Sequence, residues 1–425
     1  METRRQYKKD QSEFGQKRYK DLKHEVQKLC RQPQNQYYNN KCEEIEKLEA
    51  THNPLLYKKI KEMFPKKHTT TQLIKDKDGN FLYEPTKILE RWAEYVEELY
   101  DDIRDDSTVD IVTQETSIIT ELEVKSVIQK LLRNKATGSD NIPAEFLQSL
   151  GERGLQVITK LMNKIYNTGI IPDDFLQNIF ITIPKVNGAQ ECSDYRTISL
   201  ISHTSKILLQ LINNRITPII ERHLSDRQMG FRKGKGTRDA IFQLRTISER
   251  AIQVNKTIYA CFVDFQKAFD RINHEKLLNI MEKAGIPDLE RKLIKSLYWN
   301  QYAVVKTSDG KSRRICIRRG VRQGCIISPI LFNLYSEYMM MEVQEEGKGI
   351  MIGGQNFNNI RYADDASIMS DNELELQRMI TKLNNVCKEY GMDINVKKTK
   401  TLVTNKSGHI NYAISINGSV LEQLQ

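Results

Sequence analysis

The stretch Ile360-Arg361-Tyr362-Ala363-Asp364-Asp365-Ala366-Ser367-Ile368-Met369 places two adjacent carboxylates between two short runs of strand-forming residues. β-Branched and aromatic residues favour strands and Asp tolerates turn backbone, so the pattern predicts two strands joined by a tight turn with the acids at its tip. Acids at such a tip point outward and can hold a divalent cation. In most proteins an Asp-Asp pair alone is a plain solvated turn, and the rest of the chain must decide between these interpretations.

A second predicted strand supplies a carboxylate 100 positions before Asp364. The apolar run from Ile258 to Val263 ends at Asp264, which predicts a buried strand that delivers one carboxylate to its C-terminal edge. Asp270 and His274 follow at the start of a predicted helix. A capping role for Asp270 and a first-turn polar contact for His274 are the simpler interpretations there, so neither residue is assigned to catalysis.

Two cations flank a loop earlier in the chain. The run from Phe180 to Lys185 predicts a strand that returns at Arg196 to Leu200, with the polar residues 186–195 as the connecting loop. Because Arg binds phosphate bidentately and Lys acts as a point charge, a facing Lys185 and Arg196 could hold a triphosphate. By themselves they could also be ordinary surface cations.

Two glycine-containing segments could approach a nucleotide. The basic run from Phe231 to Thr237 lets a phosphate chain come close, but it lacks the spacing of a Walker loop. Gln323 and Gly324 precede a predicted helix, where a glycine beside a planar amide admits a base or sugar or serves as a loop cap. Helices are predicted over 88–99, 121–132, 154–167, 240–254, 331–341 and 372–390, and hairpins around 78–79, 308–310 and 417–418.

The positive charge is concentrated at the N-terminus. The chain has a net charge of +10, and residues 1–70 contain 17 Lys and Arg against 10 Asp and Glu, which leaves +3 for the rest. This part reads as polar helix from Glu2 to about Glu62 with a break at Arg31-Gln32-Pro33. Contact with a nucleic-acid backbone and a solvated helix pair remain equally open. The acidic segment from Asp101 to Asp110 predicts a domain boundary.

Composition excludes several classes of protein. The chain is 39% hydrophobic and 28% charged, has no run long enough to span a membrane, and begins with charged residues where a signal peptide is apolar. We therefore expect an intracellular protein, nuclear or cytoplasmic, with no membrane partner. Seven scattered cysteines without a C-x-x-C pair predict reduced thiols and no structural metal.

Taken in order, these segments resemble the reverse transcriptases of non-LTR retrotransposons over roughly residues 121–400, with weaker similarity back through the 78–79 hairpin and the helix that contains Trp92. The motifs that carry the resemblance are Asp194-Tyr195-Arg196-Thr197-Ile198-Ser199, Gln228-Met229-Gly230-Phe231-Arg232, Phe262-Val263-Asp264-Phe265-Gln266-Lys267-Ala268-Phe269-Asp270, Gln323-Gly324 with Ser328-Pro329, Tyr362-Ala363-Asp364-Asp365, and Gly391-Met392-Asp393-Ile394-Asn395 with Lys398-Thr399-Lys400.

The resemblance implies an α+β right-hand polymerase fold of fingers and palm, with an antiparallel palm sheet backed by helices. Residues 1–110 would form a basic, mostly helical N-terminal extension with a β-hairpin, 111–255 the fingers, 256–405 the palm, and 406–425 the start of a truncated C-terminal region. In this family an endonuclease domain precedes the polymerase and a primer grip and thumb follow it. We expect these parts to be missing.

The resemblance also implies a set of site residues. Asp264 and Asp364 would bind two Mg²⁺ ions, with Mn²⁺ as a substitute, while Asp365 supports the cluster and the Phe265 carbonyl is a candidate further ligand. The ring of Phe269 would lie where a ribose 2′-hydroxyl projects, which favours deoxynucleotides.

Other residues would bind the nucleotide. Lys185 and Arg196 would hold the triphosphate and Gln323-Gly324 would contact the incoming nucleotide. Lys398 is a candidate proton donor to pyrophosphate, in competition with two neighbouring lysines and with the interpretation of a solvated lysine cluster.

The function that the resemblance implies is RNA-directed DNA synthesis, in which dNTPs are added to a DNA primer on an RNA template. A catalytically silent nucleic-acid-binding remnant of a retroelement is the alternative, because the thumb is expected to be missing and the N-terminus is basic. A group II intron maturase, which shares the palm motifs, is a third and weaker interpretation. The sequence leaves the oligomeric state open.

Overall fold

The computed structural model describes residues 12–50, 55, 59, 74–104, 111, 118–344, 347–406 and 410–424. The chain divides into two compact units, Met1–Gln72 and Leu73–Gln425. The helix that contains Trp92 therefore belongs to the second unit. The predicted boundaries at residues 110, 255 and 405 all fall within that unit and stay predictions.

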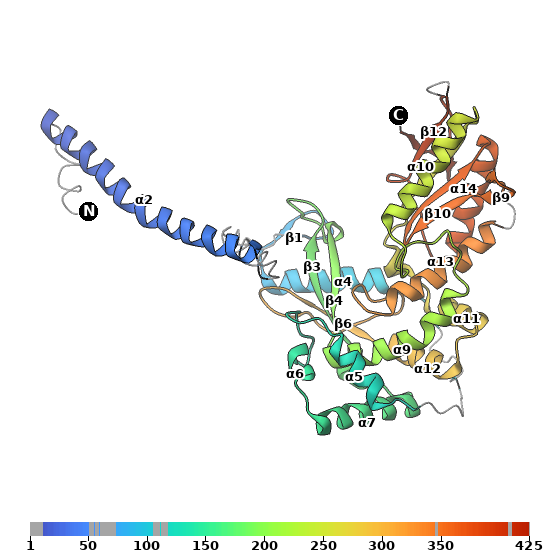
Figure 1. The fold of residues 1–425 in the computed structure, drawn as a ribbon, viewed down its shortest axis with the longest axis horizontal. Helices are drawn as coiled ribbons and strands as arrows, with labels where there is room; N and C mark the ends of the chain where they lie inside the picture. Colours follow the sequence, from blue (N-terminus) through green and yellow to red (C-terminus); the bar gives the residue numbers. More distant parts are fainter. Residues whose placement is uncertain are drawn as a thin grey trace. The chain divides into compact units, whose positions relative to one another are not determined.

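The first unit contains one long helix, α2 (Glu13–Ala50), drawn in blue in Figure 1. The break predicted at Arg31-Gln32-Pro33 is wrong, because α2 runs through Pro33 without interruption. A proline in a helix loses one backbone hydrogen bond, but the Arg and Gln before it are strong helix formers. The predicted helix between Ala50 and Glu62 and the acidic segment after Arg104 lie mostly outside the described residues.

The palm sheet has five strands. In spatial order they are β10 (Asn359–Tyr362), β11 (Asp365–Ser370), β5 (Ile258–Val263), β12 (Lys400–Thr404) and β15 (Glu422–Gln423). The first four pair antiparallel, and β15 adds to β12 in parallel. The expected antiparallel palm sheet is confirmed, and it joins strands from three distant parts of the sequence.

Helices cover both faces of this sheet. Helices α13 (Ser328–Gln344) and α14 (Glu373–Glu389) lie together in Figure 1 and share a core with Cys261 and Val263 of β5. On the opposite face, α10 (Thr237–Gln253) packs with Ala260 of β5. The period of two along a strand explains why neighbouring residues of β5 join different cores. Because helices cover both faces of the sheet, any side chains of its strands that contact a substrate must lie at the strand ends.

A second sheet has four strands. In spatial order they are β4 (Tyr195–Leu200), β3 (Gln177–Pro184), β6 (Tyr302–Lys306) and β7 (Ile315–Cys316). The predicted hairpins β3–β4 and β6–β7 are both present. The parallel pairing of β3 with β6, which joins the two hairpins, was not foreseen. This sheet carries Lys185 and Arg196.

The remaining elements complete the described fold. They are hairpins β1–β2 (Ile74–Lys75, Phe81–Leu82), β8–β9 (Ile350–Ile352, Gln355–Phe357) and β13–β14 (Ser415–Ile416, Ser419–Val420), helices α4 (Pro85–Tyr100), α5 (Glu121–Gln129), α6 (Ala144–Gln148), α7 (Glu152–Thr168), α8 (Asp173–Leu176), α9 (His203–Glu221), α11 (His274–Lys283) and α12 (Asp288–Trp299), and 3₁₀ turns η1 (Cys192–Asp194) and η2 (Ala268–Arg271). Among the described helices, none is long and apolar enough to cross a membrane.

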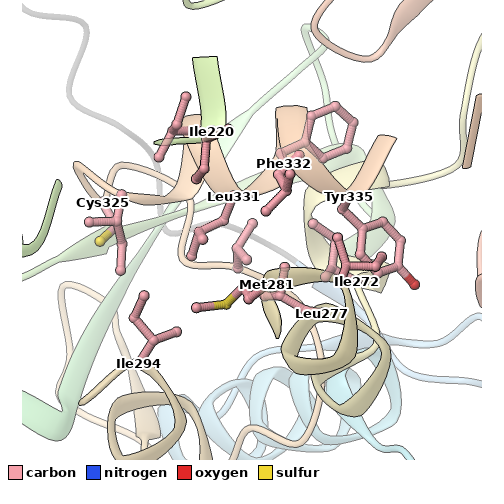
Figure 2. Packing of buried hydrophobic residues seen from close by; sticks show 14 of the residues in the cluster. Ile220, Ile272, Leu277, Met281, Ile294, Cys325, Leu331, Phe332 and Tyr335 are labelled. Atoms are coloured by element: carbon pink, nitrogen blue, oxygen red, sulfur yellow. The ribbon is translucent and has the colours of Figure 1, made fainter. Parts of the chain in front are cut away.

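The largest core of the described residues is built mainly from helices, together with strands of the palm sheet. Figure 2 shows Ile220 of α9 beside Leu331 and Phe332 of α13, with Leu277 and Met281 of α11 below them. Leu331 and Met281 are fully buried. Helices from the predicted fingers and palm thus share one hydrophobic core, which fixes the strand ends of one sheet relative to the other.

Candidate active site

Three carboxylates meet at one end of the palm sheet. Tyr362 pairs with Asp365, so the β10–β11 turn consists of Ala363 and Asp364, and Asp365 opens strand β11 instead of lying at the tip as expected. Strand β11 pairs with β5 up to the last residue of β5, and Asp264 follows directly. The sheet register therefore brings Asp264 next to the two acids of the hairpin.

The surroundings of Asp364 and Asp365 disfavour their ionisation and raise the pKa of both. Burial raises the pKa of Asp364, and the neighbouring charges of Asp365 and Asp264 raise it further. Burial and the charge of Asp264 likewise raise the pKa of Asp365. Clustered acids of this kind attract a cation that would neutralise them.

The acids do not form a closed metal cage. In the described part of the chain, no three His, Cys, Asp or Glu side chains are already gathered around one point. Asp264 and Asp364 line one cavity, and Asp264 and Asp365 line its neighbour. Hard oxygen donors in pairs fit Mg²⁺, which usually takes one or two carboxylates and completes its shell with water and substrate phosphate.

The first cavity has a volume of about 420 Å³ and joins both sheets. It collects eight of the ten predicted site residues, namely Lys185, Arg196, Asp264, Phe265, Phe269, Gln323, Asp364 and Lys398. Asp365 lines the second cavity, of about 360 Å³. Gly324 lines neither of these two cavities; it has a φ of +95°, and a side chain there would press on the Ser199 carbonyl.

Cations crowd the first cavity. Burial lowers the pKa of the Lys185 ammonium, and the charges of Lys398 and Arg196 lower it further. The Lys185 Nζ donates to the Ser193 carbonyl at 2.8 Å. Like charges held this close to one another form a site for a polyanion, because a bound anion relieves their repulsion.

Lys398 is the lysine of its segment that reaches the acids. Its Nζ lies 4.0 Å from the nearer carboxylate oxygen of Asp264, and its side chain is 70% exposed. Lys400 instead lies in β12 and pairs with Glu422, and Lys397 lines neither cavity.

Phe269 forms a rigid wall of the first cavity. Its ring stacks on Phe332 with centroids 4.4 Å apart and contacts Phe231 edge to face at 6.1 Å. Phe332 is 1% exposed and belongs to the main core. A ring held on a core residue cannot swing away cheaply from a substrate placed against it.

The turn that carries Asp364 is held by Gln228, which the sequence placed in a family motif but to which it assigned no role. Ala363 has a φ of +58°, a left-handed conformation that disfavours a residue with a Cβ. The buried Gln228 side chain accepts from the Ala363 N–H at 2.9 Å and donates to its carbonyl at 3.3 Å. Gly230 packs so closely that a side chain there would collide with the Ala363 backbone. The Gln228-Met229-Gly230 segment thus shapes the turn.

Asp270 does not cap a helix, which corrects the prediction. Asn273 caps α11, because its side chain accepts from the Lys276 N–H. Asp270 is 5% exposed and instead lies at the wall of the first cavity. Burial raises its pKa to about 6, and the nearby Tyr100 hydroxyl partly opposes this rise.

His274 makes the expected polar contact near the start of α11. Its Nε2 lies 2.8 Å from the Gly320 carbonyl oxygen, and the ring is buried. Burial lowers its pKa to about 3, so the imidazole is neutral and Nε2 donates. The residue ties α11 to the segment that leads to Gln323.

Helix α4, assigned from the sequence to the N-terminal extension, forms part of the cavity wall. It contributes Tyr95 and Leu99 directly, and its last residue, Tyr100, donates a hydrogen bond to Asp270 at 2.7 Å. Lys267 donates to the Tyr95 hydroxyl at 2.5 Å. From the sequence, only the apolar face of this helix could be predicted. Its contacts with Asp270 and Lys267 could not, because those residues lie about 170 positions away.

The family model for "Reverse transcriptase (RNA-dependent DNA polymerase)" matches residues 183–412. The chain is 27% identical to a retrovirus-related Pol polyprotein from type-1 retrotransposable element R2 of Popillia japonica, over 57% of this chain and 34% of the relative. It is also 27% identical to a probable RNA-directed DNA polymerase from transposon BS of Drosophila melanogaster, over 71% of this chain and 34% of the relative. The chain thus spans about a third of the length of these relatives.

Among solved structures, the chain is similar to telomerase from Candida tropicalis in complex with a fragment of telomeric RNA. The match has a TM-score of 0.42 and 15% identity, and it covers 60% of this chain and 47% of the other.

Proposed function

Because the chain belongs to the reverse transcriptase (RNA-dependent DNA polymerase) family, we propose that it is an RNA-directed DNA polymerase that adds deoxynucleotides to a primer 3′ end. Its α+β architecture of fingers and palm is the right-hand polymerase fold that the sequence implied. The observation that carries the proposal is the first cavity, which five cationic side chains line together with Asp264 and Asp364. The cations of the cavity suit the negative phosphates of a triphosphate, and the carboxylates suit the metal ions bound to it.

Asp264 and Asp364 would hold two Mg²⁺ ions together with the phosphates of the nucleotide, and Mn²⁺ would substitute. The Phe265 carbonyl is a further candidate ligand, since Phe265 lines the same cavity. When bound, the ions activate the primer hydroxyl and stabilise the leaving group. Asp365, on the side of the second cavity, would support the cluster by its charge.

Lys185 and Arg196 would bind the triphosphate, and the Arg196 guanidinium would contact two phosphate oxygens at once. Gln323 and Phe269 would contact the sugar. The stacked ring of Phe269 would leave no room for a 2′-hydroxyl, which favours dNTPs. Lys398, beside Asp264 and open to solvent, is a candidate donor of a proton to pyrophosphate.

The second cavity would receive the primer terminus. It is lined mainly by apolar groups from α10, β5 and the hairpin, among them Ile241 and Tyr362, and it shares Asp264 and Lys398 with the first cavity. A primer end in one cavity and a nucleotide in the other would meet at Asp264. The RNA template and DNA primer would be held through backbone contacts without sequence reading.

Primer extension on an RNA template with dNTPs and Mg²⁺ tests the proposal. We expect extension by the wild-type chain and its loss in Asp364→Ala. Asp371→Ala, which removes an exposed acid just beyond the opposite end of β11, is the matched control and should extend normally. Extension that persists in Asp364→Ala would overturn the assignment of the acids. Salt-sensitive RNA binding without extension by the wild type would instead indicate a nucleic-acid-binding module.

A further inference from the structure

Asp270 is a buried carboxylate at the wall of the first cavity for which the proposed chemistry has no role. Its Oδ1 accepts two hydrogen bonds, from the Tyr100 hydroxyl at 2.7 Å and from the Gln323 Nε2 at 3.2 Å. The side chain is 5% exposed. A buried carboxylate only accepts hydrogen bonds, so it dictates which end of a neighbouring amide faces it.

This contact orients the Gln323 amide. If the amide were reversed, its oxygen would face the Asp270 carboxylate, and two acceptors would repel each other in a buried site. The NH₂ group therefore faces Asp270. The amide oxygen is left for the cavity that Gln323 lines.

The backbone holds Gln323 beside the segment that carries Phe269, the residue proposed to contact the sugar. The Val321 N–H donates to the Phe269 carbonyl at 2.8 Å, and the Gly320 N–H donates to the Ile272 carbonyl at 2.7 Å, so the two segments run together. The Gln323 carbonyl in turn accepts from the Ser199 N–H at 3.0 Å. Gln323 is thus fixed by its main chain next to the segment that carries Phe269.

An acceptor oxygen in this place selects a hydroxyl. Phosphate oxygens are themselves acceptors, so the Gln323 oxygen cannot hold them. The sugar of a deoxynucleoside triphosphate has a single hydroxyl, at the 3′ carbon, which can donate. A site built to accept from a hydroxyl disfavours an analogue that lacks it, because the buried acceptor is then left unpaired.

We propose that Asp270 is a positioning residue that turns the Gln323 amide oxygen toward the 3′-hydroxyl of the incoming deoxynucleotide, so that the site prefers dNTPs over dideoxynucleotides. Tyr100 of helix α4 donates a hydrogen bond to the same Asp270 oxygen. This inference rests on the proposed polymerase function.

Single-nucleotide incorporation tests the proposal. For each variant, kcat/KM is measured for one dNTP and for the matching ddNTP, and the ratio of the two is compared with the wild type. Asp270→Leu combined with Tyr100→Phe removes the acceptor without leaving the tyrosine hydroxyl unpaired. We expect the ratio to fall by about three- to tenfold, mainly through a higher KM for the dNTP, as the loss of one hydrogen bond predicts.

Three variants serve as controls. Asp270→Asn keeps an acceptor oxygen in the same place and should retain the preference, as should Tyr100→Phe alone. Tyr335→Phe removes a buried hydroxyl that donates to the Tyr390 carbonyl, away from both cavities, and should leave the ratio unchanged. A merely structural role would lower both kcat/KM values equally and leave the ratio intact.

The outcomes separate this inference from the proposed function. An unchanged ratio in the Leu/Phe double variant, or a fall of equal size in Asp270→Asn, overturns the role of Asp270 while leaving the polymerase in place. Calorimetry measures the dissociation constants of the dNTP and the ddNTP for each variant, so the same ratio is compared without any turnover. A chain that binds dNTP more tightly than ddNTP but extends no primer would overturn the polymerase function and still support the selection. Binding of neither nucleotide overturns both.

Discussion

At the scale of single residues, the proposed sugar selection depends on the ring stack at the cavity wall. Phe269 lies flat on Phe332, which is anchored in the main core, so the position of its edge is set by packing and not by the substrate. We expect Phe269→Ala to raise kcat/KM for ribonucleotides relative to deoxynucleotides by about ten- to a hundredfold, the range typical of small steric differences in a pocket.

Competition between rNTP and dNTP in primer extension measures this change. Phe231→Ala is the matched control, since it removes the other ring that contacts Phe269 without lining the first cavity. An Ala variant at 269 that still rejects ribonucleotides as strongly as the wild type would show that another group provides the selection.

Asp270 should lower stability at neutral pH. Burial raises its pKa from the usual value of 3.8 to about 6, despite the charges and hydrogen bonds that oppose the rise. The groups that face it are Tyr95 and Tyr100 of α4, Lys185 at the end of β3, Lys267 of its own segment, and Gln323. A group that binds its proton more tightly when folded destabilises the fold as pH rises from about 4 to 6, and the penalty is complete above that.

We therefore expect Asp270→Asn to increase the free energy of unfolding at pH 8 by about 1–3 kcal/mol, from roughly two pKa units at 1.36 kcal/mol each. The gain should vanish near pH 4. Denaturant unfolding at the two pH values measures it. A variant that is less stable than the wild type at pH 8 would contradict the pKa direction.

At the scale of elements, the β10–β11 hairpin depends on a clamp from outside the sheet. The amide of Gln228 makes hydrogen bonds to both backbone groups of Ala363, the left-handed residue before Asp364. We expect Gln228→Leu to lower kcat for extension by about tenfold or more and to raise the Mg²⁺ concentration needed for half-maximal rate. The turn would then relax and move Asp364, and buried bonds of this kind are worth about 1–3 kcal/mol when one partner is left unsatisfied.

Gln377 offers a matched control for this clamp. Its side chain makes the same two-way contact with the backbone of Ser415, and neither residue lines the first or the second cavity. Gln377→Leu should cost similar stability but leave the Mg²⁺ dependence unchanged. Adding Ala363→Gly to Gln228→Leu should restore part of the stability, because glycine tolerates the left-handed turn. Equal Mg²⁺ profiles for the two Leu variants would refute the positioning role.

The sequence predicted those parts of the site whose local structure is determined by neighbouring residues in the chain. The strand before Asp264, the hairpin around Asp364 and the β3–β4 hairpin follow from residue alternation and turn signals. The Gln228 clamp and the Asp270–Tyr100 contact join positions 135 and 170 residues apart. Gln228 and Asp270 lie in motifs that carry the family resemblance, but the motifs do not reveal which distant residue each one contacts. Long-range pairing, such as the parallel contact of β3 with β6, likewise depends on the complete fold.

At the scale of the whole molecule, the first cavity and the basic N-terminal residues 1–70 belong to different units of the chain. All residues that line the cavity lie between Tyr95 and Lys398, within the unit Leu73–Gln425. Helix α4 belongs to this unit, with Trp92 fully buried in a core shared with β3 and β6. The predicted extension 1–110 therefore contains two parts with different expected roles.

Two truncations distinguish these parts. A chain of residues 73–425 should keep primer extension, since it retains every cavity residue. A chain of residues 101–425 lacks Tyr95, Leu99 and Tyr100 and loses the buried Trp92, so it should unfold at lower temperature and extend poorly. The chain of residues 73–425 also lacks most of the net positive charge of the protein. Its RNA binding should therefore depend less steeply on salt than that of the full chain. If both truncations extend equally well, α4 is not part of the catalytic unit; if the salt slopes of 73–425 and the full chain coincide, the N-terminal arm does not contact RNA.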